Sequence, residues 1–97
     1  MKKIQEQSVV LRHREASHRV IEELALIVMP REATMLTLNR VGTQIWTRLG
    51  ANTVEELASG LTDEYEVSRD QALTDTISFL EELRAKGLVV LAAGEES

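Results

Sequence analysis

The stretch Thr37–Gly50 does most to constrain how this 97-residue chain can fold. An apolar segment leads directly into a predicted helix, because the side-chain oxygen of Asn39 can cap free N–H groups of a first turn. Trp46, the single tryptophan, falls in this helix, and a glycine at position 50 is typical of a helix end. The other apolar residues recur at helical spacing, at Val41, Ile45 and Leu49. The pattern predicts a helix over 40–49 that packs one side, including Trp46, into a core.

Two more helices are predicted, each with its own cap. Thr53 and Glu56 have the spacing of a capping box, in which each side chain bonds the other residue's backbone N–H. This helix runs to about Tyr65. The last helix begins after Ser68, and Gly87 ends it.

Short apolar runs predict the strands. Val9–Leu11 and Leu88–Leu91 lie near the two ends of the chain, and the turn Pro30–Ala33 joins Leu24–Met29 to Thr34–Leu38. Periodicity alone would also allow a buried helix over 24–29, but the second apolar run just beyond it favours a strand. The order predicts an α+β, winged-helix-like fold. In it, a small antiparallel sheet of three N-terminal strands packs on a three-helix bundle, and a short strand closes the chain.

Length and composition predict one domain, 1–97, with an ordered core of about 9–91 and flexible tails that offer little apolar surface. No apolar run approaches the about 18 residues of a membrane span, and the N-terminus lacks the apolar stretch of a signal peptide. There is no cysteine, which excludes disulfides and thiolate metal sites. We therefore expect a cytoplasmic protein with no membrane partner.

No catalytic or metal site is predicted. His13 and His18 are five residues apart, without the helical spacing or the nearby third ligand of a zinc motif, and we interpret both as solvated. The carboxylates gather in runs such as Glu55-Glu56 and Glu81-Glu82 on predicted helix surfaces, and the five glycines are scattered rather than arranged as a phosphate loop. The chain is therefore expected to be non-enzymatic and to use no cofactor.

The charge pattern argues against nucleic acid as a partner. The net charge is −5, but residues 1–20 carry +3, whereas residues 53–84 carry −7. In winged-helix proteins the last helix of the bundle usually enters the major groove, and here that region would repel phosphates. A DNA-binding regulator stays an alternative that charge disfavours.

The last helix and the strand 34–38 suggest a peptide site. The apolar residues of the helix cover an arc of about 160°, wider than the about 100° stripe that seats a surface helix. Either the whole arc is core, or one edge of it borders an open groove. In the strand, Leu36 and Leu38 can face the core while Met35 and Thr37 face elsewhere. If this strand lies at a sheet edge, its unpaired backbone groups form a template for strand addition, and no Lys or Pro guards it.

Several short motifs follow one another along the chain in a definite order. They are Leu38-Asn39, Gly42, Ile45-Trp46, Thr53-Val54-Glu55-Glu56-Leu57 and Phe79-Leu80 with Leu83, Gly87 and Leu88. Their order and spacing resemble the PqqD family, small winged-helix proteins that recognise ribosomally made precursor peptides. The resemblance spans roughly 9–91, although this chain has Pro30–Ala33 where many relatives have a glycine in the hairpin turn.

The resemblance implies a non-catalytic adaptor. It would bind the leader of a precursor peptide as an added strand between the third strand and the third helix. It would then present the leader to a modifying enzyme, which is a radical-SAM protein in pyrroloquinoline quinone (PQQ) biosynthesis; another peptide modification pathway is equally compatible. A structural subunit, with the groove filled by its own chain or by the mate in a homodimer, stays open. The implied peptide-binding residues are Thr34, Met35, Leu36, Thr37 and Leu38 at the edge, and Leu73, Thr76, Ile77 and Leu80 on the helix.

Overall fold

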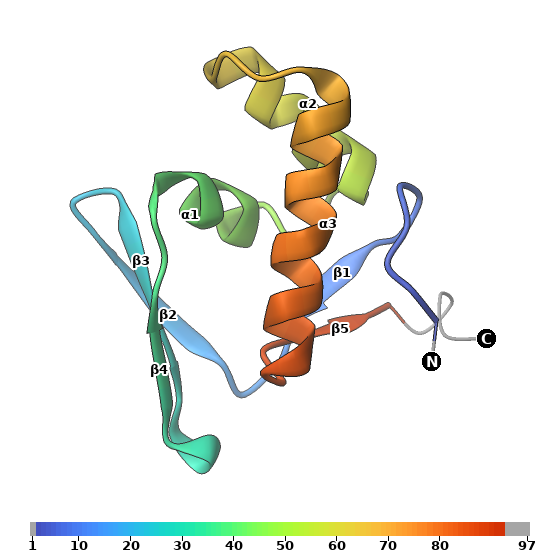
Figure 1. Cartoon of the computed structure of the whole chain (residues 1–97). Coiled ribbons are helices and arrows are strands. Elements are labelled where there is room, and N and C mark those ends of the chain that lie inside the picture. The colour runs from blue at the N-terminus through green and yellow to red at the C-terminus, as the bar shows by residue number, and fades with distance from the viewer. Residues whose placement is uncertain (1, 93–97) are drawn as a thin grey trace.

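The computed structural model describes residues 2–92, apart from the side chain of Glu32. It confirms the α+β class and the predicted order of the helices (Figure 1). Pro30–Glu32 forms a short 3-10 turn. The elements are β1 (Val10–Arg12), β2 (Ser17–Ile21), β3 (Leu24–Met29), β4 (Thr34–Thr37), α1 (Arg40–Thr47), α2 (Val54–Glu64), α3 (Arg69–Ala85) and β5 (Val89–Leu91).

The strands form two antiparallel sheets. β1 pairs with β5, and the other sheet has the order β2-β3-β4, with β3 in the centre. β2 was not predicted from the sequence, and it takes the place in the three-stranded sheet that was predicted for Val9–Leu11, since β1 pairs with β5 instead. All five β2 residues are exposed, so this strand lacks the alternation of apolar and polar residues that would have indicated it. It forms because its backbone pairs with β3, from Ser17 opposite Val28 to Ile21 opposite Leu24.

The predicted helix caps are confirmed. The Asn39 side chain accepts a hydrogen bond from the Gly42 N–H at 2.8 Å. Thr53 and Glu56 form both bonds of the capping box, and the Ser68 hydroxyl accepts a bond from the N–H of Gln71. Each helix therefore begins where its own sequence satisfies the free N–H groups of the first turn.

The core lies where the inner face of the three-stranded sheet meets the helices. Ala25, Ile27 and Met29 of β3 point inward and are buried. Trp46 is fully buried, as predicted, with the His18 ring edge-on at 6.0 Å and the Arg12 guanidinium 5.8 Å from its centroid. No helix within residues 2–92 combines the length and the apolar character needed to cross a membrane.

The segment before β1 is held more firmly than its composition suggested. Ile4 is only 4% exposed, and its N–H donates to Glu81 of α3 at 3.2 Å. Arg69 bonds both Glu6 and Glu55 at 3.1 Å. The hydrogen bond to Glu6, followed by the charge of Glu55, raises the pKa of Arg69. The buried Ile4 side chain and the bond from Arg69 to Glu6 therefore hold residues 4–6 against the rest of the fold, although this segment was expected to be flexible. The predicted flexible tail, apart from Ala92, lies outside the described residues.

Two turns hold non-glycine residues in left-handed backbone conformations. The β2–β3 loop consists of Glu22 and Glu23, with φ of 52° and 70°, and Ala33 before β4 has φ 53°. A two-residue hairpin loop of type I′ requires positive φ at both loop residues, and Asn-Gly is the usual sequence of such a turn. Ala33 closes the 3-10 turn, and its N–H donates to the carbonyl of Pro30.

Candidate functional site

β4 lies at an open edge of the three-stranded sheet, since it pairs with β3 alone. The Leu38 N–H, just past the strand, donates to the carbonyl of Ala25 at 2.8 Å. Hydrogen-bonded and non-hydrogen-bonded pairs alternate along an antiparallel ladder. The backbone groups of Leu36 therefore point to β3, and those of Met35 and Thr37 point out of the sheet edge. Within residues 2–92, no strand pairs with that side of β4.

The side chains of β4 alternate between the two faces of the sheet. Leu36 is half-buried against the core, and Leu38 is buried. Thr34 is half-buried on the same side. Met35, by contrast, is 69% exposed, and Thr37 is also exposed. An added strand would thus meet Leu36 on the inner side of the edge and Met35 on the outer side.

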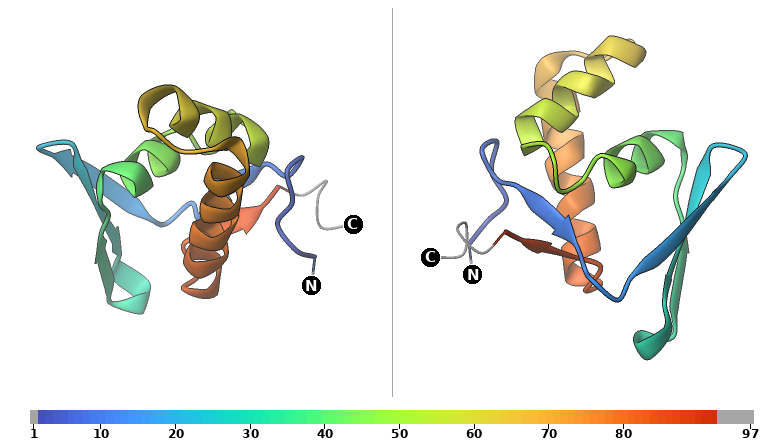
Figure 2. Two further views of the ribbon diagram at one scale, coloured as in Figure 1. Left: turned by 45° about the horizontal axis from the view of Figure 1, so that its top comes forward. Right: turned by 180° about the vertical axis from the view of Figure 1, so that it is seen from behind.

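The structure separates the four helix residues that were predicted to form a wall. Thr76 and Leu80 are fully buried and belong to the core. Leu73 and Ile77 are half-buried and line a hollow of about 450 Å³ together with Ile4 and residues 5–7. That hollow lies on the flank of α3 that carries the N-terminal segment, whereas β4 lies on the other flank (Figures 1 and 2).

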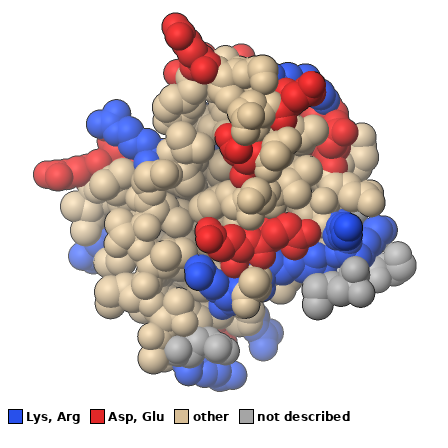
Figure 3. Space-filling view, viewed as in Figure 1, with Lys and Arg blue, Asp and Glu red and all other residues tan. Residues whose placement is uncertain are grey.

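The flank of α3 toward β4 carries Phe79. A Cβ built on Gly42 would lie 3.1 Å from Cζ of Phe79, so the ring rests against the first turn of α1, which directly follows β4. Residues three or four apart share a helix face, which groups Phe79 with Asp75, Glu82 and Lys86. We call these four residues the α3 row. Figure 3 shows acidic side chains along the exposed side of α3.

The flank of α3 that faces β4 could not be identified from the sequence. The apolar arc of α3 has Phe79 at one end and Ile77 at the other, so the helix alone does not show which end faces β4. The contact of Phe79 with Gly42 answers this question, because Gly42 lies in the first turn of α1, the helix that follows β4. The signal available in the sequence was Gly42, because a helical position without a side chain permits close approach of a neighbouring element.

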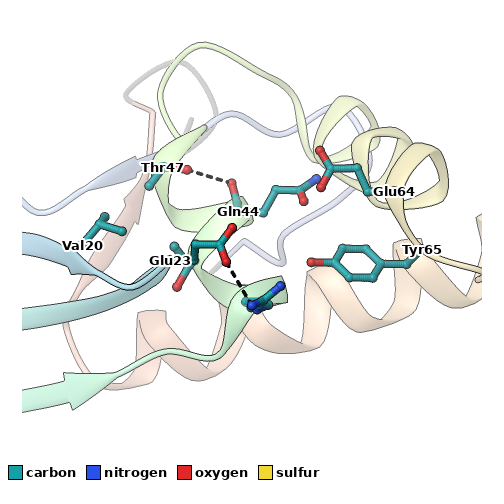
Figure 4. Close-up of a pocket in the computed structure, with 8 residues that line it drawn as sticks. Val20, Glu23, Gln44, Thr47, Glu64 and Tyr65 are labelled. Carbon is teal, nitrogen blue, oxygen red and sulfur yellow. Dashed lines mark hydrogen bonds and ion pairs between the residues drawn. The ribbon is translucent and has the colours of Figure 1, made fainter.

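A second, polar hollow of about 330 Å³ lies among the β2–β3 turn, α1 and the end of α2 (Figure 4). Its charged groups are paired: Glu23 with Arg40 at 2.9 Å, and Glu64 with Arg48 at 3.5 Å. The Thr43 hydroxyl accepts the N–H of Ala25. The Thr47 hydroxyl donates to the carbonyl of Gln44, and we assign this hollow no chemistry.

An open strand edge beside a helix is the arrangement of small domains that bind peptides by strand addition. The chain matches the family model of coenzyme PQQ synthesis protein D (PqqD) over residues 25–89. It therefore belongs to the PqqD family, which confirms the resemblance seen in the sequence.

Solved structures share the fold. One is TbiB1 in complex with the TbiA(beta) leader peptide, with 25% identity and a TM-score of 0.78 over 81% of this chain and 93% of that chain. Another is lasso peptide synthetase B1 complexed with the leader peptide, with 24% identity and a TM-score of 0.77 over 84% of this chain and 96% of that chain. A search of curated protein sequences found no match.

Proposed function

We propose that this chain is a non-catalytic adaptor that binds the leader of a ribosomally made precursor peptide along β4 and presents it to a modifying enzyme. The observation that carries the proposal is the open β4 edge in a member of the PqqD family. Both similar structures hold leader peptides, which supports the same role here.

The leader binds as a fourth strand of the β2-β3-β4 sheet. The N–H and C=O groups of Met35 and Thr37 exchange hydrogen bonds with it and set its register. Alternate leader side chains turn inward, toward Leu36 and Phe79. The rest of the α3 row borders the leader, and the fully buried Thr76 and Leu80 hold the helix in place from beneath. Leu73 and Ile77 are outside this site.

The enzyme served by the adaptor is a peptide-modifying enzyme, either the radical-SAM protein of PQQ synthesis or an enzyme of another pathway. The family name favours the first, and the similarity to lasso peptide synthetase B1 supports the second. The leader sequence distinguishes them, because each pathway has its own precursor.

Affinity capture from cells of the source organism tests the proposal. The wild-type chain should recover a short ribosomally encoded peptide, identified by mass spectrometry. The variant Met35→Pro should lose that peptide, and Met35→Ala should retain it, because only proline removes the N–H that faces the open edge. Equal recovery by all three proteins would contradict strand addition along β4.

A further inference from the structure

The outer face of the three-stranded sheet is an exposed apolar surface. Ala25, Ile27 and Met29 of β3 are buried on the inner face, and the strand register places their neighbours on the other side. We call the following set the outer face: Ser17, Arg19 and Ile21 of β2, Leu24, Leu26 and Val28 of β3, and Met35 and Thr37 of β4. In Figure 2 the helices lie on the opposite side of the sheet.

Several features of the outer face indicate a contact surface. Ile21, Leu24 and Met35 are 54%, 36% and 69% exposed. Leu26 and Val28, between them, are half-buried and line a hollow of about 360 Å³ together with residues 17–19. A contiguous exposed apolar surface with a hollow in it is typical of protein–protein contact sites.

Charge decides what kind of partner fits. Arg19 is the one charged residue of the outer face, and it forms no ion pair with any residue of 2–92. In a face-to-face pair with a second copy of this chain, the outer face offers no carboxylate to Arg19, so the guanidinium would be covered without an ion partner, which is unfavourable. A partner with apolar side chains and a carboxylate opposite Arg19 is complementary.

The outer face also continues into the proposed peptide site, since Met35 and Thr37 belong to both. A leader added beside β4 would extend this face with its own outward side chains. A partner on the outer face would therefore touch the adaptor and the bound leader together, and would bind the loaded adaptor more tightly than the empty one.

Building on the proposed function, we propose that the outer face docks the peptide-modifying enzyme through an apolar patch that includes a carboxylate. The carboxylate pairs with Arg19, and an apolar side chain enters the hollow beside Leu26 and Val28. The enzyme thereby selects the adaptor that already carries a leader.

Photo-crosslinking in cells of the source organism tests this inference. The photoreactive residue p-benzoylphenylalanine replaces Ser17, at the rim of the outer face, or Ser59, on the exposed side of α2, as a matched control. We expect the Ser17 probe, but not the Ser59 probe, to crosslink to a peptide-modifying enzyme identified by mass spectrometry. Adding Arg19→Glu should lower the yield at least tenfold without affecting leader capture.

Three results would overturn the inference: a crosslink to a second copy of this chain, no crosslink above the Ser59 control, or a crosslink that survives Arg19→Glu. Leader capture, measured in the same cells, shows whether only the docking surface is wrong or the proposed function as well. Leader capture without an enzyme crosslink would refute only the docking surface, whereas loss of leader capture by the wild-type chain would refute the adaptor role itself.

Discussion

The Phe79 ring rests against the backbone of Gly42, where an added Cβ would lie only 3.1 Å from the ring. This contact joins α3 to the first turn of α1, the helix that follows β4. It also explains why a glycine is needed in the first turn of α1, a place where glycine otherwise weakens a helix.

The first prediction concerns this contact. Gly42→Ala should lower the free energy of unfolding by about 1–2 kcal/mol, because crowding of the ring outweighs the gain in helix propensity. In a Phe79→Ala background the same change should become stabilising by about 0.5–1 kcal/mol. Urea denaturation of the four proteins in a double-mutant cycle measures the coupling. Additive effects would show that Gly42 and Phe79 do not interact.

The second prediction concerns the strand edge. Met35→Pro should remain folded, because proline is tolerated on an edge strand where its missing N–H faces outward. It should weaken leader binding at least about tenfold. Leu36→Pro should instead unfold the hairpin, since the Leu36 N–H belongs to the ladder with β3. Circular dichroism measures whether each variant is folded, and fluorescence anisotropy with the captured leader measures its binding. Unchanged leader affinity in a folded Met35→Pro variant would show that the leader binds elsewhere.

The third prediction concerns Ala33. Its left-handed backbone is costly for any residue with a Cβ, so Ala33→Gly should raise the free energy of unfolding by about 0.5–1 kcal/mol, even though glycine also gains entropy in the unfolded chain. Ala33→Val should lower it. Thermal melting compares the three proteins, and a glycine variant less stable than wild type would refute the assigned backbone conformation.

The fourth prediction concerns Trp46. Because its ring is fully buried, Trp46→Ala should cost about 3–5 kcal/mol, and Trp46→Phe should cost less because it keeps part of the packing. An unchanged melting curve for the alanine variant would contradict the core position.

Salt dependence provides a fifth prediction and separates peptide from nucleic acid as the ligand. Strand addition relies on backbone hydrogen bonds and apolar contact, so leader affinity should change little between about 50 and 200 mM salt. DNA binding through several phosphate contacts would fall by about 10³–10⁵ over that range. A steep loss of affinity would therefore favour the winged-helix DNA-binding alternative.

The sequence predicted best what is determined locally. The helix caps at Asn39, Thr53 and Ser68 depend on residues within one turn, and the alternation of β4 depends on its own side chains. β2 could not be predicted, because all its residues are exposed and only pairing with β3 makes it a strand. The flank of α3 beside β4 was also hidden, because contacts across the fold decide it: Ile4 covers the Leu73 side, and Gly42 meets Phe79.

Strand addition along β4 is tested most directly by the hydrogen-exchange rates of the β4 amides, measured by NMR with and without the captured leader. In the free protein, the Met35 and Thr37 amides should exchange quickly and that of Leu36 slowly, because only the Leu36 N–H bonds to β3. Leader binding should slow Met35 and Thr37 and leave Leu36 nearly unchanged. If the leader binds while Met35 and Thr37 still exchange at their free rates, it does not add to this edge, and strand addition along β4 is refuted.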